Sequence, residues 1–444
     1  MSVAIHFEKK VKQIKPMHAV NNGPIRNRDV QQTRDNWKSY KEAGIPYARN
    51  HDASFISAYG GEHIVDVHAI FPDFRADPYD PDSYDFTLTD DYLQDTIDAG
   101  TGVFYRLGTK IEHTRKKYGS IVPADFGKWA VICEHIIRHY NEGWASGFHH
   151  NIVYWEIWNE PDGKKINGDQ PNWSGTPEEY YDLYITAATH LKKCFPELKI
   201  GGPAFSWVKG EEDPWIDGFF RAITRGNQRV PLDFFSWHQY DTGTRGILQS
   251  AEIVDNWLKK YGYPDAENIL NEWNYIEGWT DKFVSSLRAI AGMRGAAFSA
   301  AVMIACQNDS PVDMAMYYDA SVGTVFNGMF DYLSYEPLKG YYPFLIFSRL
   351  YELKTQVDCQ SEPDVYVTAA DNGEEKGILL AYYTGREETE WKEIQLVFSG
   401  GCDGEWQGEL LDCDNTMTPF KLEVVHGKGS LTLQTDSVVY LSRK

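Results

Sequence analysis

Ile152–Asp162 reads I-V-Y-W-E-I-W-N-E-P-D, and it begins as a buried strand. Its first residues are apolar, β-branched or aromatic, which is typical of a strand in a protein core. Pro161 cannot continue a hydrogen-bonded ladder and pushes the residue before it into an extended conformation, so we expect the strand to stop there. Glu160 is therefore predicted to lie at the C-terminal tip of a core strand.

A carboxyl group in that position has a chemical use. Poor solvation between a tryptophan-rich strand and a proline raises the pKa of a carboxylic acid, and a general acid needs a raised pKa near neutral pH. Asn159, directly before Glu160, can donate and accept hydrogen bonds at a sugar hydroxyl. The alternative is a buried strand that ends in a surface glutamate. The string W-N-E-P and a second glutamate downstream favour the functional interpretation.

The second glutamate lies in Asn268–Asn274, which reads N-I-L-N-E-W-N. A short apolar strand again delivers a glutamate, Glu272, next to an asparagine and to Trp273, which we expect to contact substrate. Two glutamates at the ends of different strands of one barrel would meet at the same mouth. Glycoside hydrolysis uses such a pair: one acid protonates the leaving oxygen, and one carboxylate attacks or activates water.

Alternating strands and helices fill residues 15–351 and predict a (β/α)₈ barrel, an α/β fold, with insertions. The predicted strands are Lys15–Val20, Pro46–Asn50, Gly102–Gly108, Ile152–Trp158, Lys199–Gly202, Leu232–Trp237, Asn268–Leu270 and Ala301–Cys306. Residues 352–444 change character, because short strands separated by turns such as D-N-G-E predict an all-β sandwich. Alternation at Val3, Ile5 and Phe7 predicts one further strand, and we expect residues 1–14 to join the sandwich.

Further polar residues follow the predicted barrel strands. Arg49 ends the second strand, where its role is either a plain salt bridge or holding Glu272 ionised and oriented. His51 follows it. His238 and Tyr240 come directly after the sixth strand; Tyr240 can hydrogen-bond a nucleophile there, and His238 is either a satisfied polar residue or part of the site. We expect these side chains to bind substrate around the two glutamates.

Composition narrows the class of partner. The formal net charge of −21 argues against nucleic acid and anionic membrane surfaces. Aromatic residues make up 14% of the chain, which suits both a large core and sugar stacking. No apolar run approaches a membrane span, the first residues lack a signal-peptide core, and the six cysteines show no C-x-x-C spacing, so we expect a cytoplasmic protein with free thiols.

The remaining signals are weak. Glu134, His135 and His139 approach a metal-binding spacing without forming H-E-x-x-H, and we expect them on a solvated helix face. No nucleophile elbow and no dinucleotide fingerprint is present. We therefore predict neither a cofactor nor a metal.

The combined motifs resemble a known group of enzymes. W-N-E-P at the fourth strand, S-W-H-Q-Y at the sixth and N-E-W at the seventh resemble the retaining glycosidases of clan A. The string E-I-W-N-E-P-D, the H-x-Y and the trailing β module resemble glycoside hydrolase family 39, which includes β-xylosidases and α-L-iduronidases. The resemblance implies that Glu160 is the acid/base and Glu272 the nucleophile.

The leading hypothesis is accordingly an exo-acting retaining glycosidase similar to β-xylosidases, with a glycoside or oligosaccharide as partner and self-association left open. Two alternatives stay open. One is an iduronidase-like or other sugar specificity: the basic loop Lys110–Lys117 favours a uronate-containing substrate, because a uronate carboxylate needs a cationic partner. The abundant aromatics and the trailing sandwich would also fit a non-catalytic carbohydrate-binding protein on a decayed barrel.

Overall fold

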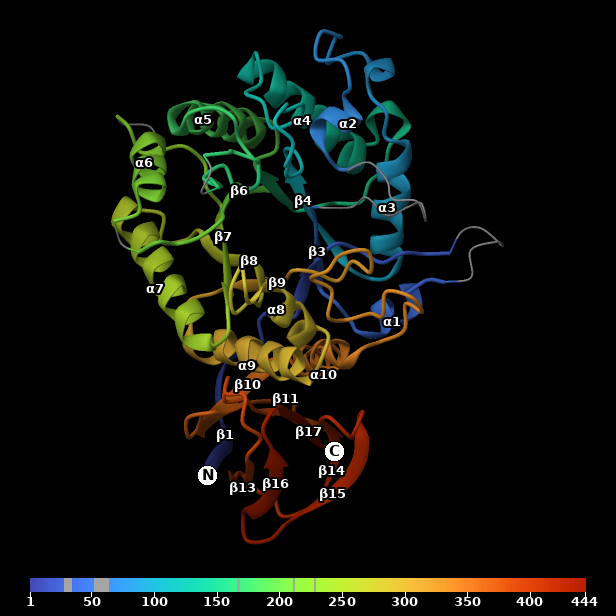
Figure 1. Cartoon of the computed structure of the whole chain (residues 1–444), viewed down its shortest axis with the longest axis vertical. Helices are drawn as coiled ribbons and strands as arrows, with labels where there is room; N and C mark the ends of the chain where they lie inside the picture. The colour runs from blue at the N-terminus through green and yellow to red at the C-terminus, as the bar shows by residue number, and fades with distance from the viewer. Residues whose placement is uncertain (28–33, 52–63, 166–167, 211, 227–228) are drawn as a thin grey trace.

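The computed structural model describes residues 1–27, 34–51, 64–165, 168–210, 212–226 and 229–444. It contains a closed eight-stranded barrel and a nine-stranded sheet beside it (Figure 1). The prediction of a (β/α)₈ barrel with a C-terminal, mostly antiparallel β domain is confirmed. Part of the predicted loop Asp52–Thr87 lies outside the described residues.

The barrel closes because each strand pairs in parallel with the next and the first pairs with the last. Its C-terminal mouth is therefore formed by the loops that follow the strands, where barrels of this kind place their chemistry. The strands are β2 (Ala19–Asn21), β3 (Tyr47–Asn50), β4 (Gly102–Leu107), β5 (Tyr154–Ile157), β6 (Lys199–Phe205), β7 (Phe234–Asp241), β8 (Glu267–Tyr275) and β9 (Met314–Tyr317).

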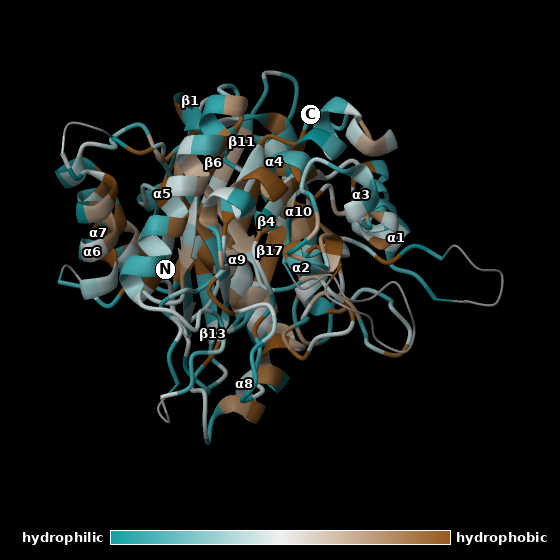
Figure 2. Ribbon diagram, turned by 90° about the horizontal axis from the view of Figure 1, so that it is seen from above, coloured by the Kyte–Doolittle hydropathy of each residue, from teal (hydrophilic) through white to brown (hydrophobic). Residues whose placement is uncertain are grey.

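Helices surround the barrel and turn their apolar faces inward, as the hydropathy colouring of α6 and α7 illustrates (Figure 2). They are α1 (Trp37–Glu42), α2 (Val67–Ile70), α3 (Thr87–Asp98), α4 (Phe126–Glu142), α5 (Pro177–Cys194), α6 (Pro214–Ile223), α7 (Thr244–Tyr261), α8 (Phe283–Ile290), α9 (Met293–Asp309) and α10 (Tyr342–Leu353). The α5 helix begins with a capping box in which Thr176 and Glu179 satisfy each other's backbone N–H groups.

One predicted strand is wrong. Ala301–Cys306 belongs to α9, and the last barrel strand is β9. The α9 helix is buried on almost every side because it lies between the barrel and the β domain, where it contacts β11 (Val365–Asp371), β12 (Lys376–Tyr382) and β17 (Ser437–Arg443). A helix that is apolar all round loses its 3.6-residue period, so a short part of it cannot be told from a buried strand by pattern alone.

The β domain is one continuous sheet in the order β15-β14-β17-β12-β11-β10-β1-β13-β16. Its edge strands β15 and β16 are joined directly at Val425–Lys428, so the sheet folds over and encloses a core of its own. The N-terminal strand lies inside this sheet, antiparallel to β10 and parallel to β13. The strands not yet given are β1 (Ser2–Gln13), β10 (Thr355–Ser361), β13 (Trp391–Ser399), β14 (Gly404–Leu411), β15 (Thr418–Val424) and β16 (Lys428–Gln434).

Within the described residues, no single helix has the length and apolarity to cross a membrane; the sharply bent pair α8 and α9 meets those two criteria only when taken together. All six cysteines have free thiols.

Candidate active site

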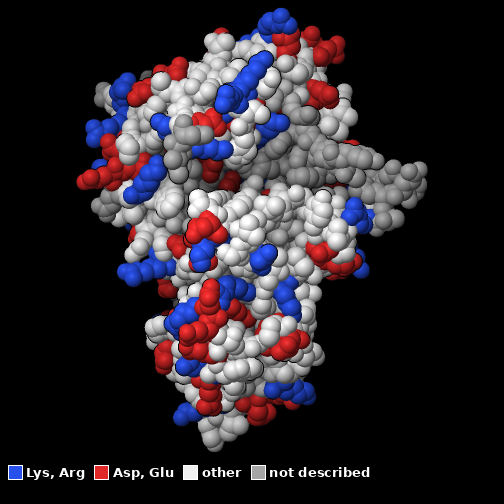
Figure 3. Space-filling view, viewed as in Figure 1, with Lys and Arg blue, Asp and Glu red and all other residues white. Residues whose placement is uncertain are grey.

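Strands β3, β5, β7 and β8 and the turns after them bring the predicted site residues together at the barrel mouth. The space-filling view shows a hollow in this face of the barrel, with acidic atoms at its floor (Figure 3). The Glu160 side chain is 16% exposed and the Glu272 side chain 6%. Both carboxyl groups are therefore largely shielded from water yet within reach of a ligand.

From Pro161 we predicted that Glu160 would lie at the tip of its strand, and this is wrong. The β5 strand ends earlier, at Ile157, and the chain turns with positive φ at Trp158 (77°) and Glu160 (45°). The Glu160 amide donates to the carbonyl of Ala204 on β6 at 2.9 Å, which fixes the turn to the neighbouring strand. Left-handed backbone at a bulky residue costs on the order of 1–3 kcal/mol and is typical of functional sites.

Two side chains hold the Glu160 carboxyl group. The Nδ1 atom of His238 lies 2.8 Å from its Oε1, and the Nδ2 group of Asn172 donates to Oε2 at 2.8 Å. Asn172 in turn accepts the indole N–H of Trp158 on its backbone carbonyl at 2.8 Å. We did not predict Asn172, because it lies in an irregular loop with no local pattern.

Glu272 lies inside β8 and not at its end, which also corrects the prediction. The pairing register of β8 shifts at this point against both neighbouring strands. Such bulges re-aim a side chain. The Nη1 group of Arg49 donates to Glu272 Oε1 at 2.7 Å, and the Tyr240 hydroxyl donates to Oε2 at 2.9 Å. Both contacts favour the ionised form of Glu272, and they place Arg49 and Tyr240 at this carboxylate, where we expected them.

His238 joins the two glutamates. Its Nδ1 atom lies 3.3 Å from Glu272 Oε2 as well as 2.8 Å from Glu160, and one oxygen of each carboxyl group lies within 4.8 Å of the other. Carboxyl groups about 5–5.5 Å apart are typical of retaining glycosidases, whereas inverting enzymes separate them by about 6.5–9.5 Å. The same three side chains are also close enough to ligate a cation.

Burial keeps the imidazole of His238 neutral. Desolvation lowers its pKa to about 4, and the nearby charge of Glu272 opposes this only in part. Its Nε2 atom is buried and has no hydrogen-bond partner among the described residues. Carboxylate oxygens are hydrogen-bond acceptors, and Nδ1 faces two of them, so Nδ1 can donate only if it carries the proton. We therefore assign the proton to Nδ1, which leaves the buried Nε2 as an unpaired acceptor.

Arg49 is the centre of a buried network. Besides Glu272 it donates to Glu156 Oε2 at 2.7 Å, to Asn159 Oδ1 at 2.6 Å and to Asn21 Oδ1 at 3.0 Å. Burial alone would lower the pKa of Arg49, but the charges of Glu156 and Glu272 raise it above its ordinary value. The guanidinium is therefore a permanent cation that orients both the nucleophile candidate and Asn159.

Glu156 was missed by the sequence analysis. It is completely buried on β5 and accepts hydrogen bonds from Ser236 Oγ and Asn271 Nδ2, both at 2.6 Å. A glutamate inside an otherwise apolar strand was the available signal, since such a charge is stable only when it is paired.

Asn159 and His51 line the same network. The Nδ2 group of Asn159 is buried and has no hydrogen-bond partner among the described residues. His51 Nε2 lies 3.6 Å from Glu272 Oε1, and its Nδ1 accepts from Arg106 Nε at 3.3 Å. A buried amide with an unused donor beside two carboxyl groups is suited to hold a ligand hydroxyl.

Trp273 does not fit its predicted role as a substrate contact. It is fully buried, and its ring packs 6.1 Å from Phe298 on α9 and 5.4 Å from Tyr317. Successive side chains of a strand point to opposite faces, so the neighbour of an inward-facing Glu272 faces the helices.

A different tryptophan borders the site. Trp279 is 52% exposed, and its ring packs edge-on against Tyr240 at 5.1 Å. Phe326 lies 6.2 Å from Trp279 and 5.4 Å from Tyr318, whose ring lies 6.2 Å from His51. These rings form an aromatic wall on the Glu272 side of the mouth, and its exposed end offers a surface on which a sugar ring can stack.

The basic loop Lys110–Lys117 is partly engaged by other residues. Lys117 pairs with Asp169 at 3.0 Å, and Lys116 lies 4.9 Å from the Tyr118 ring. The buried carboxylate of Glu112 accepts hydrogen bonds from the backbone at residues 118–120, which fixes the shape of the loop. Lysine and arginine side chains nevertheless gather above the hollow (Figure 3).

Asp162, two residues after Glu160, is a further buried acid. Burial raises its pKa to about 7, repulsion by Glu160 adds to this, and hydrogen bonds from Ser206 N and Oγ oppose it. A raised pKa means that the folded chain favours the neutral acid. Its stabilising contribution is fully present below the ordinary value of 3.8 and is lost as the pH rises through about 7.

Ionisation of the buried Asp162 should lower the free energy of unfolding of the wild type by an amount on the order of 4 kcal/mol between pH 4 and 7. Asp162→Asn cannot ionise, so the variant should not show this loss. We expect the melting temperature of the variant to fall less over this range than that of the wild type. Ser206→Ala is the matched control, because removing the hydroxyl that lowers the pKa of Asp162 should steepen the fall. Parallel profiles for all three proteins in thermal denaturation would contradict the assignment.

The family model "Glycosyl hydrolases family 39" matches residues 1–322. A β-xylosidase of Caldicellulosiruptor saccharolyticus is 33% identical over 173 residues, which is 36% of this chain and 32% of the relative. A β-xylosidase of Geobacillus stearothermophilus is 32% identical over 120 residues, 27% of this chain and 21% of the relative. The chain thus matches about a third or less of the length of these relatives.

Solved structures show the same fold over the whole chain. A glucosidase from Croceicoccus marinus superposes with a TM-score of 0.79 at 22% identity, covering 99% of this chain and 98% of the other. A monomeric β-xylosidase from Caulobacter crescentus superposes with a TM-score of 0.69 at 14% identity, covering 99% of each.

Proposed function

The chain belongs to glycoside hydrolase family 39, and from this premise we propose that it is a retaining, exo-acting glycosidase similar to β-xylosidases. The observation that carries the proposal is the pair Glu160 and Glu272, which both meet the Nδ1 atom of His238 and bring one oxygen of each carboxyl group within 4.8 Å of the other. An oxygen of each group this close to the other favours the short carboxyl separation of retaining glycosidases, about 5–5.5 Å, and so it supports attack by the carboxylate itself.

In the proposed mechanism, Glu160 donates its proton to the glycosidic oxygen while Glu272 attacks the anomeric carbon. The bond to the leaving group breaks and a glycosyl–Glu272 ester forms. Glu160, now ionised, takes a proton from water, whose oxygen displaces Glu272 and releases the sugar. Arg49 and Tyr240 keep Glu272 ionised, while His238 and Asn172 position Glu160.

The configuration of the first-formed product tests this proposal. We expect proton NMR during hydrolysis of a nitrophenyl glycoside to show the same anomer as the substrate, and a 2-fluoro glycoside to label Glu272. The opposite anomer would rule out the retaining mechanism. Because the named neighbours include both β-xylosidases and a glucosidase, a panel of nitrophenyl glycosides must identify the sugar.

A second candidate is a glycoside that carries an anionic group. The basic side chains above the hollow favour it, since a carboxylate needs a cationic partner. In the same panel, a preference for a neutral pentoside over the corresponding uronide would exclude this candidate.

Asn159 should stabilise the transition state through a sugar hydroxyl. Its unused Nδ2 donor and its orientation by Arg49 suit the 2-hydroxyl, whose hydrogen bonds strengthen as the reaction proceeds. We expect Asn159→Ala to lower kcat/KM by about 10²-fold, in keeping with the loss of one preorganised donor. With a 2-deoxy substrate the same substitution should have little effect. An equal loss on both substrates would show that Asn159 acts through Arg49 alone.

A further inference from the structure

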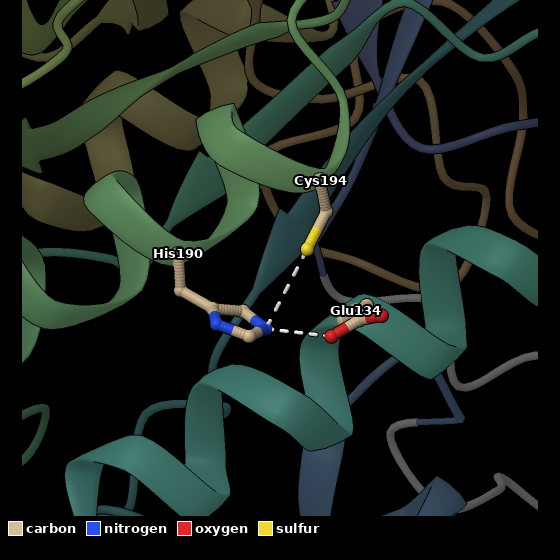
Figure 4. Close-up of side chains that lie close together, drawn as sticks. All are labelled: Glu134, His190 and Cys194. Carbon is tan, nitrogen blue, oxygen red and sulfur yellow. Dashed lines mark hydrogen bonds and ion pairs between the residues drawn. The ribbon is translucent and has the colours of Figure 1, made fainter.

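A second group of reactive side chains lies outside the barrel mouth, between helices α4 and α5. Glu134 projects from α4, and His190 and Cys194 project from α5 (Figure 4). These helices precede and follow β5, the strand that leads to Glu160. From the sequence we expected Glu134, His135 and His139 on a solvated helix face, but both histidines are buried, and His139 stacks on Phe86 at 3.6 Å.

The three side chains converge on one point. His190 Nε2 lies 2.6 Å from Glu134 Oε2 and 3.8 Å from Cys194 Sγ, and all three atoms lie within 4.8 Å of one another. Both partners face the same ring nitrogen (Figure 4). A proton relay would instead place the thiol and the carboxylate at opposite nitrogens of the imidazole. A carboxylate oxygen, an imidazole nitrogen and a sulfur around a common centre are a metal-binding donor set.

The spacing and surroundings suit a divalent ion. Zinc ligands in tetrahedral geometry lie about 3.3–3.6 Å apart, so the carboxylate and the imidazole need to separate only slightly. Arg138 Nε donates to Glu134 Oε1 at 2.8 Å, which turns the other oxygen towards His190. His190 and Cys194 are four residues apart on one helix face, and the His190 side chain is 31% exposed, so an ion can enter from solvent.

We propose that Glu134, His190 and Cys194 bind one zinc ion, with water as fourth ligand, and that the ion braces α4 against α5. Binding deprotonates the thiol, so one proton per zinc passes to solvent. Cys194 ends α5 and precedes the start of β6, which places the ion towards the end of the barrel opposite the mouth. Residues at that end serve stability and not chemistry. The inference does not depend on the proposed hydrolase activity.

Cobalt titration of the reduced, chelator-treated full chain tests the site, because cobalt bound to a thiolate gives an intense near-ultraviolet charge-transfer band. We expect one equivalent of cobalt to produce the band and zinc to remove it by displacement. Cys194→Ser should abolish the band. Cys413→Ser is the matched control and should leave it unchanged, although Cys413 lies in another close group with Asp412 and Asp414.

Two further readouts separate this site from the barrel mouth. Zinc should raise the melting temperature of the wild type, and His190→Gln and Glu134→Gln should each weaken its affinity at least about tenfold. The turnover number should not change when this site fills, whereas an ion at Glu160, His238 and Glu272 would inhibit. If Cys194→Ser does not fold, His190→Gln, which keeps the thiol, carries the same test. Three results would overturn the proposal: no band in the wild type, a band that persists in Cys194→Ser, or a band that is lost in Cys413→Ser.

Discussion

Glu272→Ala should abolish turnover of natural and activated glycosides alike, with kcat falling by at least about 10⁴-fold. Without this carboxylate no covalent intermediate can form, so a better leaving group cannot restore the rate. The geometry makes Glu272 the better nucleophile candidate, because Arg49 and Tyr240 both stabilise its ionised form. Steady-state assays with a nitrophenyl glycoside and an oligosaccharide measure the two losses.

This substitution also removes a partner of the buried Arg49, so folding must be controlled. Breaking a buried ion pair costs about 3–5 kcal/mol, and Glu156 can compensate only in part. Glu272→Gln keeps the shape and a hydrogen-bond acceptor, and it should be equally inactive while being more stable. In Glu272→Ala the space left by the carboxylate is open, so added azide should attack the anomeric carbon from that face and give the inverted glycosyl azide. A retained azide product from Glu272→Ala would assign the nucleophile elsewhere.

Glu160→Ala should show the opposite dependence on the leaving group. We expect a loss of about 10²–10⁴-fold on natural substrates, because their leaving oxygen needs a proton. A nitrophenolate needs little protonation, so the first step on that substrate should suffer much less. The second step lacks its general base, and the glycosyl–enzyme intermediate should accumulate.

Azide provides the control for Glu160→Ala, since it attacks the accumulated intermediate without a base. It should restore the rate on nitrophenyl glycosides and give a glycosyl azide of retained configuration. Mass spectrometry of the quenched enzyme should detect the intermediate at Glu272. If Glu160→Ala lowers the rate of hydrolysis of both substrates equally and azide has no effect, our assignment of the two roles is reversed.

The barrel and the two glutamates could be predicted from the sequence because both depend on local patterns. Alternating strands and helices specify the barrel, and W-N-E-P and N-E-W mark two of its strands. The exact ends of strands could not be predicted: β5 stops at Ile157 because Trp158 adopts positive φ, not because of Pro161. The error at Trp273 was avoidable, since a two-residue strand period places it opposite Glu272.

Other parts of the site depend on contacts between distant segments. Asn172 meets Glu160 through an irregular loop, and Glu156 meets Arg49 across the barrel interior. In neither pair does a sequence pattern around one residue indicate which residue it will contact. The same holds for Glu134 and His190, whose contact is set by the packing of α4 on α5. The α9 helix was misread for the converse reason, because burial on all sides removed its period.

The position of β1 inside the C-terminal sheet has a consequence for how the chain folds during synthesis. Ser2 pairs with Gln395 and Val3 with Ser361, so β1 leaves the ribosome long before either partner strand. At about 5–20 residues per second, the delay is roughly 20–80 s. During that time the barrel can close while Val3, Ile5 and Phe7 stay exposed on an unpaired strand edge, a surface that holdase chaperones bind and that promotes aggregation. The sheet can be completed only after β17, the last of its nine strands in sequence, has been synthesised, so its assembly follows that of the barrel.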